Sequence, residues 1–381
     1  MKKKYIIFSL VTLVLLVALI TSFNYFKTTN TYIDDSFNNQ TKITKGISMN
    51  LEQTAGAGDY KTVTRSSWPT EGYKFNTELS RCENGGELSW DDINKKVIVT
   101  GNVSDKCYVY FDIWIPSIAA YCTSGTDLAT CVKNFGDQGP SVSNIYIHNS
   151  ALTNGAGDNS YRYAGANPNN YVCFGSEATT CPDANLFRII GVFGDQTKVI
   201  RAKSVGDKAW HSSESNTWST SSLNTYLNGE YLTSLGTLAD KIATTTWKVG
   251  GGSTTYLYDV PKTAYQYEVG SSASTTTYDA KIGLMYVSDY GFAADQSGWT
   301  TKLSSYNSNK SKNWLNTGKY IELTLSRNSD STRNAFGVNS TGYVDNYNVT
   351  KSYVVRPSFN LESSVKYVSG SGSMSDPVRV N

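Results

Sequence analysis

The N-terminal segment constrains this chain more than any other part of it. Lys2, Lys3 and Lys4 precede an uncharged run at 5–23, YIIFSLVTLVLLVALITSF. At about 1.5 Å of rise per helical residue, such a run comes close to the roughly 30 Å hydrocarbon core of a bilayer. Lysines before the run, with no basic cluster directly after it, place the N-terminus in the cytoplasm and the rest of the chain outside the cell.

Two interpretations of this run stay open. A cleaved signal peptide would end in small residues in an A-x-A-like arrangement, which ITSF at 20–23 lacks. The length of the run and the missing cleavage site favour an uncleaved signal anchor. We therefore expect residues 1–26 to contain the cytoplasmic lysines and one transmembrane span, with the C-terminal part extracellular. Both interpretations export the chain.

Export indicates that the six cysteines form disulfides, because disulfides form in an oxidising environment. In chain order they fall into three neighbouring pairs: Cys82 and Cys107, Cys122 and Cys131, Cys173 and Cys181. A zinc site is disfavoured, since His148 and His211 are the only histidines of the chain and no C-x-x-C occurs. We expect three local disulfides, no metal and no cofactor.

The charge of the chain excludes some classes of partner. The formal net charge is +2, and Lys2, Lys3 and Lys4 supply three positive charges, so the rest of the chain carries −1. A nearly neutral ectodomain argues against nucleic acid and anionic lipid as partners. The 27 tyrosines and 8 tryptophans instead favour a β-rich surface able to make short-range contacts with a ligand.

The pattern of apolar residues divides the exported part into segments. Residues 27–48 are polar and predict a stalk. Short alternating runs separated by turns at 49–116 predict a small β-sandwich-like domain. Residues 117–172 predict a connector with one short helix, capped by Thr126. Residues 173–381 contain a predicted hairpin around Gly194 and Asp195, one predicted helix at 218–235 and further predicted strands, one of them at 281–290. These elements follow in no alternating order, which predicts an α+β domain.

Several motifs of the last segment resemble an uncharacterised domain family. They are NLFRIIGVF, W-x4-LN-x-YLN-x2-YL-x2-L, IGLMYVSDYGFA, NAFGVNSTGYV and VVRPSFNL, in this order. The family occurs in surface proteins of Gram-positive gut bacteria, and the resemblance covers roughly residues 145–377. It implies no catalytic residues. The C-terminal ending is also distantly similar to C-type-lectin-like and formylglycine-generating-enzyme-like domains, which implies a lectin-like fold for 173–381.

Aromatic residues in two loops are the candidate ligand contacts. The stretch 250–278 contains alternating tyrosines and predicts a protruding hairpin with one aromatic face. The competing interpretation is a hairpin packed on its own domain. Trp299, in the loop DQSGWTTK, is expected to be exposed. We therefore expect Tyr258, Tyr267 and Trp299 to form a ligand-binding face.

Other candidate residues have a structural interpretation. Arg356 in YVVRPSFNL is expected to pair with a carboxylate or with carbonyl groups rather than with a ligand. Trp218 is expected in the core, whereas Trp210 is left open between core and surface. No G-x-S-x-G, Walker loop, H-E-x-x-H or EF-hand string occurs. The sequence therefore contains no catalytic motif, although a pair of carboxylates for glycoside hydrolysis leaves no signature.

Three classes of function remain. The first is a membrane-anchored surface protein that binds a glycan or a protein ligand, as an adhesin does. The second is a structural or envelope-assembly protein without a free ligand. The third is an extracellular hydrolase. The sequence favours the first.

Overall fold

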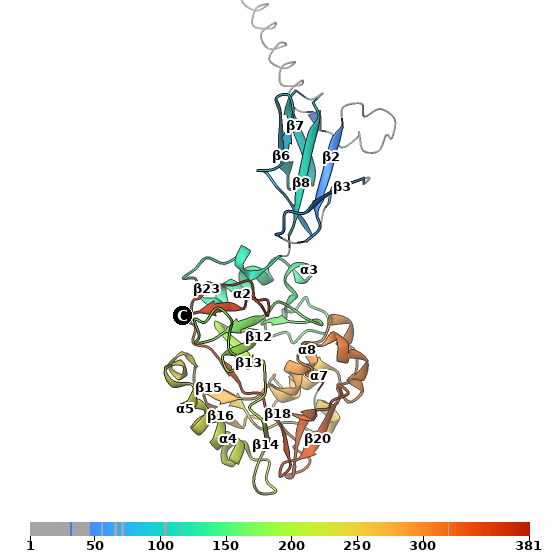
Figure 1. Cartoon of the computed structure of the whole chain (residues 1–381). Coiled ribbons are helices and arrows are strands. Elements are labelled where there is room, and N and C mark those ends of the chain that lie inside the picture. Colours follow the sequence, from blue (N-terminus) through green and yellow to red (C-terminus); the bar gives the residue numbers. More distant parts are fainter. Residues whose placement is uncertain are drawn as a thin grey trace, which may run out of the picture. The chain divides into compact units, whose positions relative to one another are not determined.

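The computed structural model describes residues 31–32, 46–54, 56–64, 67–69, 72–102, 105–114, 116–318 and 320–381. The expected span at 5–23 and nearly all of the stalk lie outside these residues. Within the described ranges, no helix is long and apolar enough to cross a membrane. The chain divides into two compact units at Ile115 and Pro116 (Figure 1).

The first unit consists of strands. They are β1 (Thr31–Tyr32), β2 (Ile47–Glu52), β3 (Tyr60–Val63), β4 (Tyr73–Phe75), β5 (Arg81–Cys82), β6 (Gly86–Asp91), β7 (Lys96–Gly101) and β8 (Cys107–Ile113). One sheet has the order β3-β2-β8-β4, with β5 also paired to β8, and the other has the order β1-β7-β6.

A single apolar core joins the two sheets of the first unit. Alternate residues of β8, among them Val109 and Phe111, are buried, as are Val97 and Val99 of β7. These side chains belong to one cluster, so the alternation typical of strands turns one face of each sheet inward. The disulfide Cys82–Cys107 then links β5 to β8 at a directly opposed pair.

The second unit is built around a nine-stranded sheet. Its strands are β9 (Ile145–Ile147), β10 (Tyr161–Tyr163), β11 (Tyr171–Cys173), β12 (Leu186–Phe193), β13 (Gln196–Arg201), β17 (Ile282–Gly283), β22 (Ser358–Asn360), β23 (Tyr367–Ser369) and β24 (Val378–Val380). The main order is β17-β22-β13-β12-β11-β24-β23, and β10 pairs with both β12 and β9.

Strand β12 lies in the middle of this sheet, and its sequence reflects that position. All its residues except Phe193 are buried, as expected for a strand covered on both faces. It forms the hairpin with β13 that the sequence indicates around Gly194 and Asp195. Gly191 is required at the crossing with β10, because a Cβ there would clash with the carbonyl oxygen of Tyr161.

A five-stranded sheet and a strand pair complete the β structure of this unit. The sheet has the order β14 (Asp207–Ala209), β21 (Ser352–Val354), β18 (Glu322–Arg327), β19 (Asn334–Val338) and β20 (Val344–Asn348). Strands β15 (Thr245–Lys248) and β16 (Thr277–Ala280) form the pair. One large core includes Val199 and Phe359 from the nine-stranded sheet and Leu323 and Phe336 from the five-stranded sheet.

The helices of the second unit are short. They are α2 (Leu128–Gly136), α3 (Pro140–Ser143), α4 (Ser222–Tyr226), α5 (Leu232–Ser234), α6 (Thr254–Leu257), α7 (Pro261–Glu268) and α8 (Val287–Phe292). A π-helical turn joins α4 to α5, so most of the expected helix at 218–235 is present. Its cap is Ser221, whose hydroxyl accepts the N–H of Asn224 at 3.0 Å. The α+β class with more strand than helix is confirmed.

Several details differ from the sequence interpretation. The N-cap of α2 is Asp127 rather than Thr126. The expected connector at 117–172 supplies β9 and β10 to the nine-stranded sheet, so the second unit starts at Pro116 rather than at 173. The stretch 250–278 forms α6 and α7 rather than a protruding hairpin. The apolar run 281–290, expected as a strand, is extended only at 282–283 and enters α8 at Val287.

The disulfides of the second unit are Cys122–Cys131 and Cys173–Cys181. The first fastens the start of the unit to α2, and the second closes a short loop after β11. Together with the bond in the first unit, these are the neighbouring pairs that the sequence indicates.

Candidate functional site

An open pocket of about 480 Å³ lies on the second unit. Its lining residues come from β9, from the loop after β9, and from the segment after α8: Tyr146, Thr153, Asn154, Asp295, Gln296 and Ser297. Five of these side chains are polar or charged without an aromatic ring, and the sixth is a half-buried tyrosine. The pocket therefore combines many hydrogen-bonding groups with one aromatic surface.

The loop between β9 and β10 forms one wall of the pocket. Oδ1 of Asn149 accepts the N–H groups of Ala151 at 3.0 Å and of Leu152 at 3.2 Å. Nδ1 of His148 accepts the N–H of Ala156 at 3.0 Å. Between these anchors Asn154 has a φ of 61°, a left-handed conformation that asparagine tolerates better than most residues.

Burial determines the state of the histidine that holds this loop. His148 is fully buried, and burial, followed by the nearby Arg162, lowers its pKa to about 2. The imidazole is therefore neutral at physiological pH. Because Nδ1 accepts a backbone N–H, the ring proton is on Nε2. His148 therefore supports the loop as a hydrogen-bond acceptor and does not serve as a pH-dependent charge.

The segment after α8 forms the other wall. Oδ1 of Asp295 accepts the N–H of Ser297 at 3.0 Å, and the N–H of Asp295 donates to the carbonyl of Lys312 at 2.9 Å. The hydrogen bonds from Ser297, and then the charge of Lys312, lower the pKa of Asp295. The carboxylate is therefore ionised. Burial raises the pKa of Tyr146, and the charge of Asp295 adds to this effect.

Trp299 lies beneath the pocket, and the expectation that it is exposed is wrong. Its side chain has no exposed area, and its indole N–H donates to the carbonyl of Ala294 at 3.0 Å. The ring packs edge to face against Tyr146, with 5.0 Å between the ring centroids, and against Phe292 at 5.4 Å. Trp299 therefore supports the tyrosine of the pocket and is itself inaccessible to a ligand.

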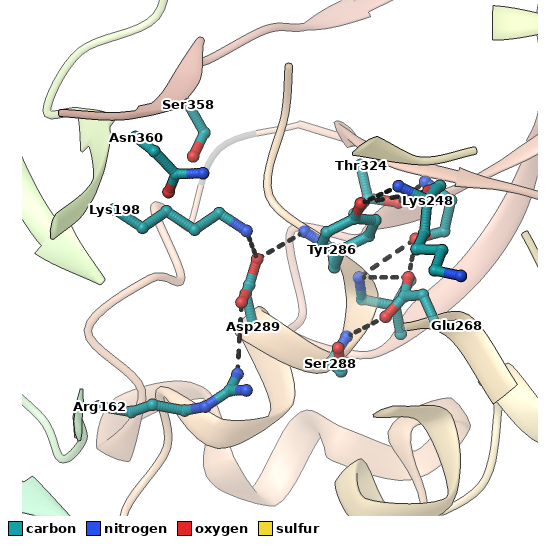
Figure 2. Close-up of polar contacts among 12 residues, drawn as sticks. Arg162, Lys198, Lys248, Glu268, Tyr286, Ser288, Asp289, Thr324, Ser358 and Asn360 are labelled. Carbon is teal, nitrogen blue, oxygen red and sulfur yellow. Dashed lines mark hydrogen bonds and ion pairs between the residues drawn. The ribbon is translucent and has the colours of Figure 1, made fainter. Parts of the chain in front are cut away.

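A buried ion network lies behind the first wall (Figure 2). Asp289 of α8 is placed between two cations, with Oδ2 2.6 Å from Nζ of Lys198 and Oδ1 3.4 Å from Nη1 of Arg162. Nη2 of Arg162 is in turn 2.6 Å from Oδ2 of Asp158, which belongs to the pocket loop. The network thus connects β13, α8 and the loop that bears Asn154.

The charge state of Asp158 keeps this network intact. Burial would raise the pKa of Asp158, but Arg162 and the hydrogen bonds from Ser160 outweigh it and lower the pKa to about 2. A buried carboxylate is stable only when it is paired, as here. Removal of any one member would leave an uncompensated charge behind the pocket.

A second buried carboxyl group, Glu268 of α7, fixes the start of α8. Its oxygens accept the N–H groups of Val287 and Ser288, each at 2.9 Å, and it also contacts the hydroxyl of Ser326 (Figure 2). Helices α7 and α8 lie side by side (Figure 1). Burial raises the pKa of Glu268 to about 7, and the hydrogen bonds from Ser288 and Val287 offset only part of this effect.

These contacts also explain why the run at 281–290 is not a continuous strand. Oδ2 of Asp289 accepts the N–H of Tyr286 at 2.9 Å, and Glu268 takes the next two N–H groups. The first N–H groups of a helix need such acceptors. Two carboxyl groups supply them here, one of them from a distant part of the sequence. Helix α8 then leads directly into Asp295 of the pocket.

The two tyrosines expected in the ligand face do not line the pocket. The hydroxyl of Tyr258 donates to Oδ1 of Asp345 at 2.5 Å and accepts from Asn346 at 2.6 Å. Tyr267 of α7 is half-buried and stacks on Tyr256 of α6, with 3.5 Å between the ring centroids. The structure therefore does not bring Tyr258, Tyr267 and Trp299 together on one exposed face.

The remaining candidates have structural roles. Arg356 is buried, its Nε donates to Oε1 of Glu322 at 2.7 Å, and Nη2 donates to the carbonyl of Leu315 at 2.8 Å. This is the structural pairing that the sequence favours. Trp210 and Trp218 are both buried and pack edge to face, so the position left open for Trp210 is the core.

Comparison with known proteins gives one match. Residues 194–363 match a family described as "Domain of unknown function (DUF6273)". No curated protein and no solved structure matches the chain. The matched region is narrower than the expected 145–377. It contains Asp295, Gln296 and Ser297 but begins after the pocket loop with Thr153 and Asn154, so only part of the pocket lies within it.

Proposed function

We propose that this chain is an exported surface protein, anchored through residues 5–23, whose second unit binds an extracellular glycan or protein in the Tyr146 pocket. The N-terminal sequence supports the export, and the three disulfides agree with an oxidising location.

The observation that carries the proposal is the availability of the polar groups in the pocket. In the described part of the chain, the side chains of Thr153, Asn154 and Gln296 make no hydrogen bond to other residues, nor does the hydroxyl of Tyr146. Amide and hydroxyl groups both donate and accept, which suits a ligand rich in polar groups. The loop that bears Thr153 and Asn154 is held by Asn149 and His148, and Tyr146 packs on Trp299, which limits the entropy cost of binding.

The pocket supports hydrolysis less well. Glycoside hydrolysis requires two carboxyl groups that flank the scissile bond. Among the six lining residues Asp295 is the one carboxylate. Three other carboxyl groups do not line the pocket and already have partners. Asp158 and Asp289 are in buried ion pairs, and Glu268 caps the start of α8. Binding without chemistry is therefore the better-supported function.

A binding screen with single side-chain removals tests the proposal. The full chain in detergent micelles should be screened on a glycan array and in protein pull-downs. Asn154→Gly removes the pocket amide and keeps the positive φ accessible, because glycine adopts that conformation freely. Asn159→Gly is the matched control, since Asn159 also has a positive φ of 57° in the same loop but does not line the pocket.

The expected result is a captured ligand whose binding falls at least about tenfold with Asn154→Gly combined with Gln296→Ala, and stays within about twofold with the control. Both variants should keep the melting temperature of the parent. A ligand that binds all variants equally, or no ligand in either screen, would overturn the proposed site.

A further inference from the structure

We infer that the ligand of the Tyr146 pocket is a non-acidic carbohydrate, and that Asp295 favours sugars that carry an amino group. This inference rests on the proposed function and specifies the chemical class of its ligand. It follows from the charge of the pocket, the kind of hydrogen-bonding groups, and the aromatic surface.

The charge of the lining excludes acidic sugars. Asp295 is the one charged residue among those that line the pocket, and it is ionised for the reasons given above. Lys312 lowers the pKa of Asp295 but does not line the pocket, and Arg162 is paired with Asp158 and Asp289. A carboxylate, sulfate or phosphate on the ligand would therefore face the carboxylate of Asp295 with no cation among the lining residues, which is a repulsive arrangement.

The same charge favours an amino group. An ammonium group placed at Asp295 would form a charge-assisted hydrogen bond, which is stronger than one between neutral groups. Asp295 is half-buried, so solvent screens such a contact less than it screens a fully exposed pair. The two walls are also held by separate contacts, so Asp295 is positioned whether or not a ligand is present.

The neutral groups of the pocket suit a sugar ring. Asn154 and Gln296 each present two donors and an acceptor, and Thr153 presents a hydroxyl group. Sugar hydroxyls need partners of both kinds. The ring of Tyr146, held by Trp299 at a centroid distance of 5.0 Å, offers an apolar surface to the C–H groups of a sugar. An apolar ligand would leave the polar groups unpaired, at a cost.

The test compares three carbohydrate probes of one length with the full chain in detergent micelles. The probes are oligomers of N-acetylglucosamine, which are neutral, of glucosamine, which are cationic, and of galacturonic acid, which are anionic. Wild-type protein should bind the first two and not the third. Asp295→Asn should weaken binding of the glucosamine oligomer at least about tenfold more than it weakens binding of the N-acetylglucosamine oligomer.

The control is Asp183→Asn, which removes a carboxylate that is 61% exposed and paired with Lys203, outside the pocket. It should leave both affinities unchanged, which separates a local contact from the effect of net charge. Equal loss of glucosamine binding in the two Asp→Asn variants would contradict the role of Asp295.

Two outcomes separate this inference from the proposed function. Preferred binding of the galacturonic acid oligomer, lost with Asn154→Gly, would overturn the inference and leave the pocket as a binding site. The same holds if none of the three probes binds while the pull-down captures a protein through the pocket. Binding of the probes that Asn154→Gly and Gln296→Ala do not affect would overturn the inference and the proposed site together.

Discussion

Replacing Glu268 by glutamine should remove a pH dependence of stability that this one carboxyl group confers. Glu268 is fully buried, and burial raises its pKa from 4.5 to about 7. A raised pKa in the folded state means that folding favours the neutral acid. The stabilisation is therefore complete below pH 4.5 and is lost as the pH rises through about 7.

The shift in the pKa sets the size of the effect. Each unit of pKa difference between the folded and unfolded states corresponds to about 1.4 kcal/mol. The free energy of unfolding should therefore fall by up to about 3 kcal/mol between acid and weakly alkaline pH because of Glu268 alone. Glutamine has nearly the same shape and does not titrate, so Glu268→Gln should lack this loss, although one N–H of α8 loses its acceptor.

The assay is urea unfolding of wild type and Glu268→Gln at several pH values, with the disulfides intact. His148 also makes stability depend on pH. Its pKa is lowered to about 2 by folding, so the free energy of unfolding rises with pH until the pH reaches the unfolded-state pKa of 6.5. That contribution is common to both proteins and cancels in the difference. Parallel stability curves for the two proteins would refute the reasoning that Glu268 is held neutral by burial.

Three further predictions concern the core, the disulfide and the topology. Trp299→Ala should destabilise the protein by about 3–5 kcal/mol, because it empties a fully buried site beneath the pocket, and a melting temperature equal to that of wild type would contradict this. Replacement of Cys173 and Cys181 by serine should cost about 2–3 kcal/mol without unfolding the protein, and peptide mapping of the wild type under non-reducing conditions should find the two linked. External protease on intact cells should remove the ectodomain and leave a short membrane-bound stub, whereas a mature protein beginning near Phe23 in the medium would contradict the anchor.

Local patterns predicted those parts of the fold that local forces determine. The alternation in β8, the apolar run of β12 and the turn at Gly194 are set within a few residues, and the cysteine pairs are close in sequence. Helix α8 shows the limit. Its run, 281–290, has the composition of a strand, but Glu268 and Asp289 supply acceptors for the first N–H groups of a helix.

The pocket was not predictable in the same way. Asn154 and Asp295 line one pocket although they are far apart in the sequence, and each lies in a segment that alone indicates an ordinary turn. The polar loop around Trp299 predicts exposure, yet the indole N–H of Trp299 donates to the carbonyl of Ala294 and its ring fills a buried site. Exposure of an aromatic residue depends on which distant segment covers it, and the sequence of its own loop does not contain that information.

The most direct test of the central claim is the affinity of the Tyr146 pocket for the N-acetylglucosamine oligomer, measured by calorimetry with wild type, Asn154→Gly combined with Gln296→Ala, and Asn159→Gly. The account predicts binding by wild type and by Asn159→Gly with affinities within about twofold, and a loss of at least about tenfold in the double variant. Equal affinity in all three folded proteins, or no binding by wild type, would contradict it.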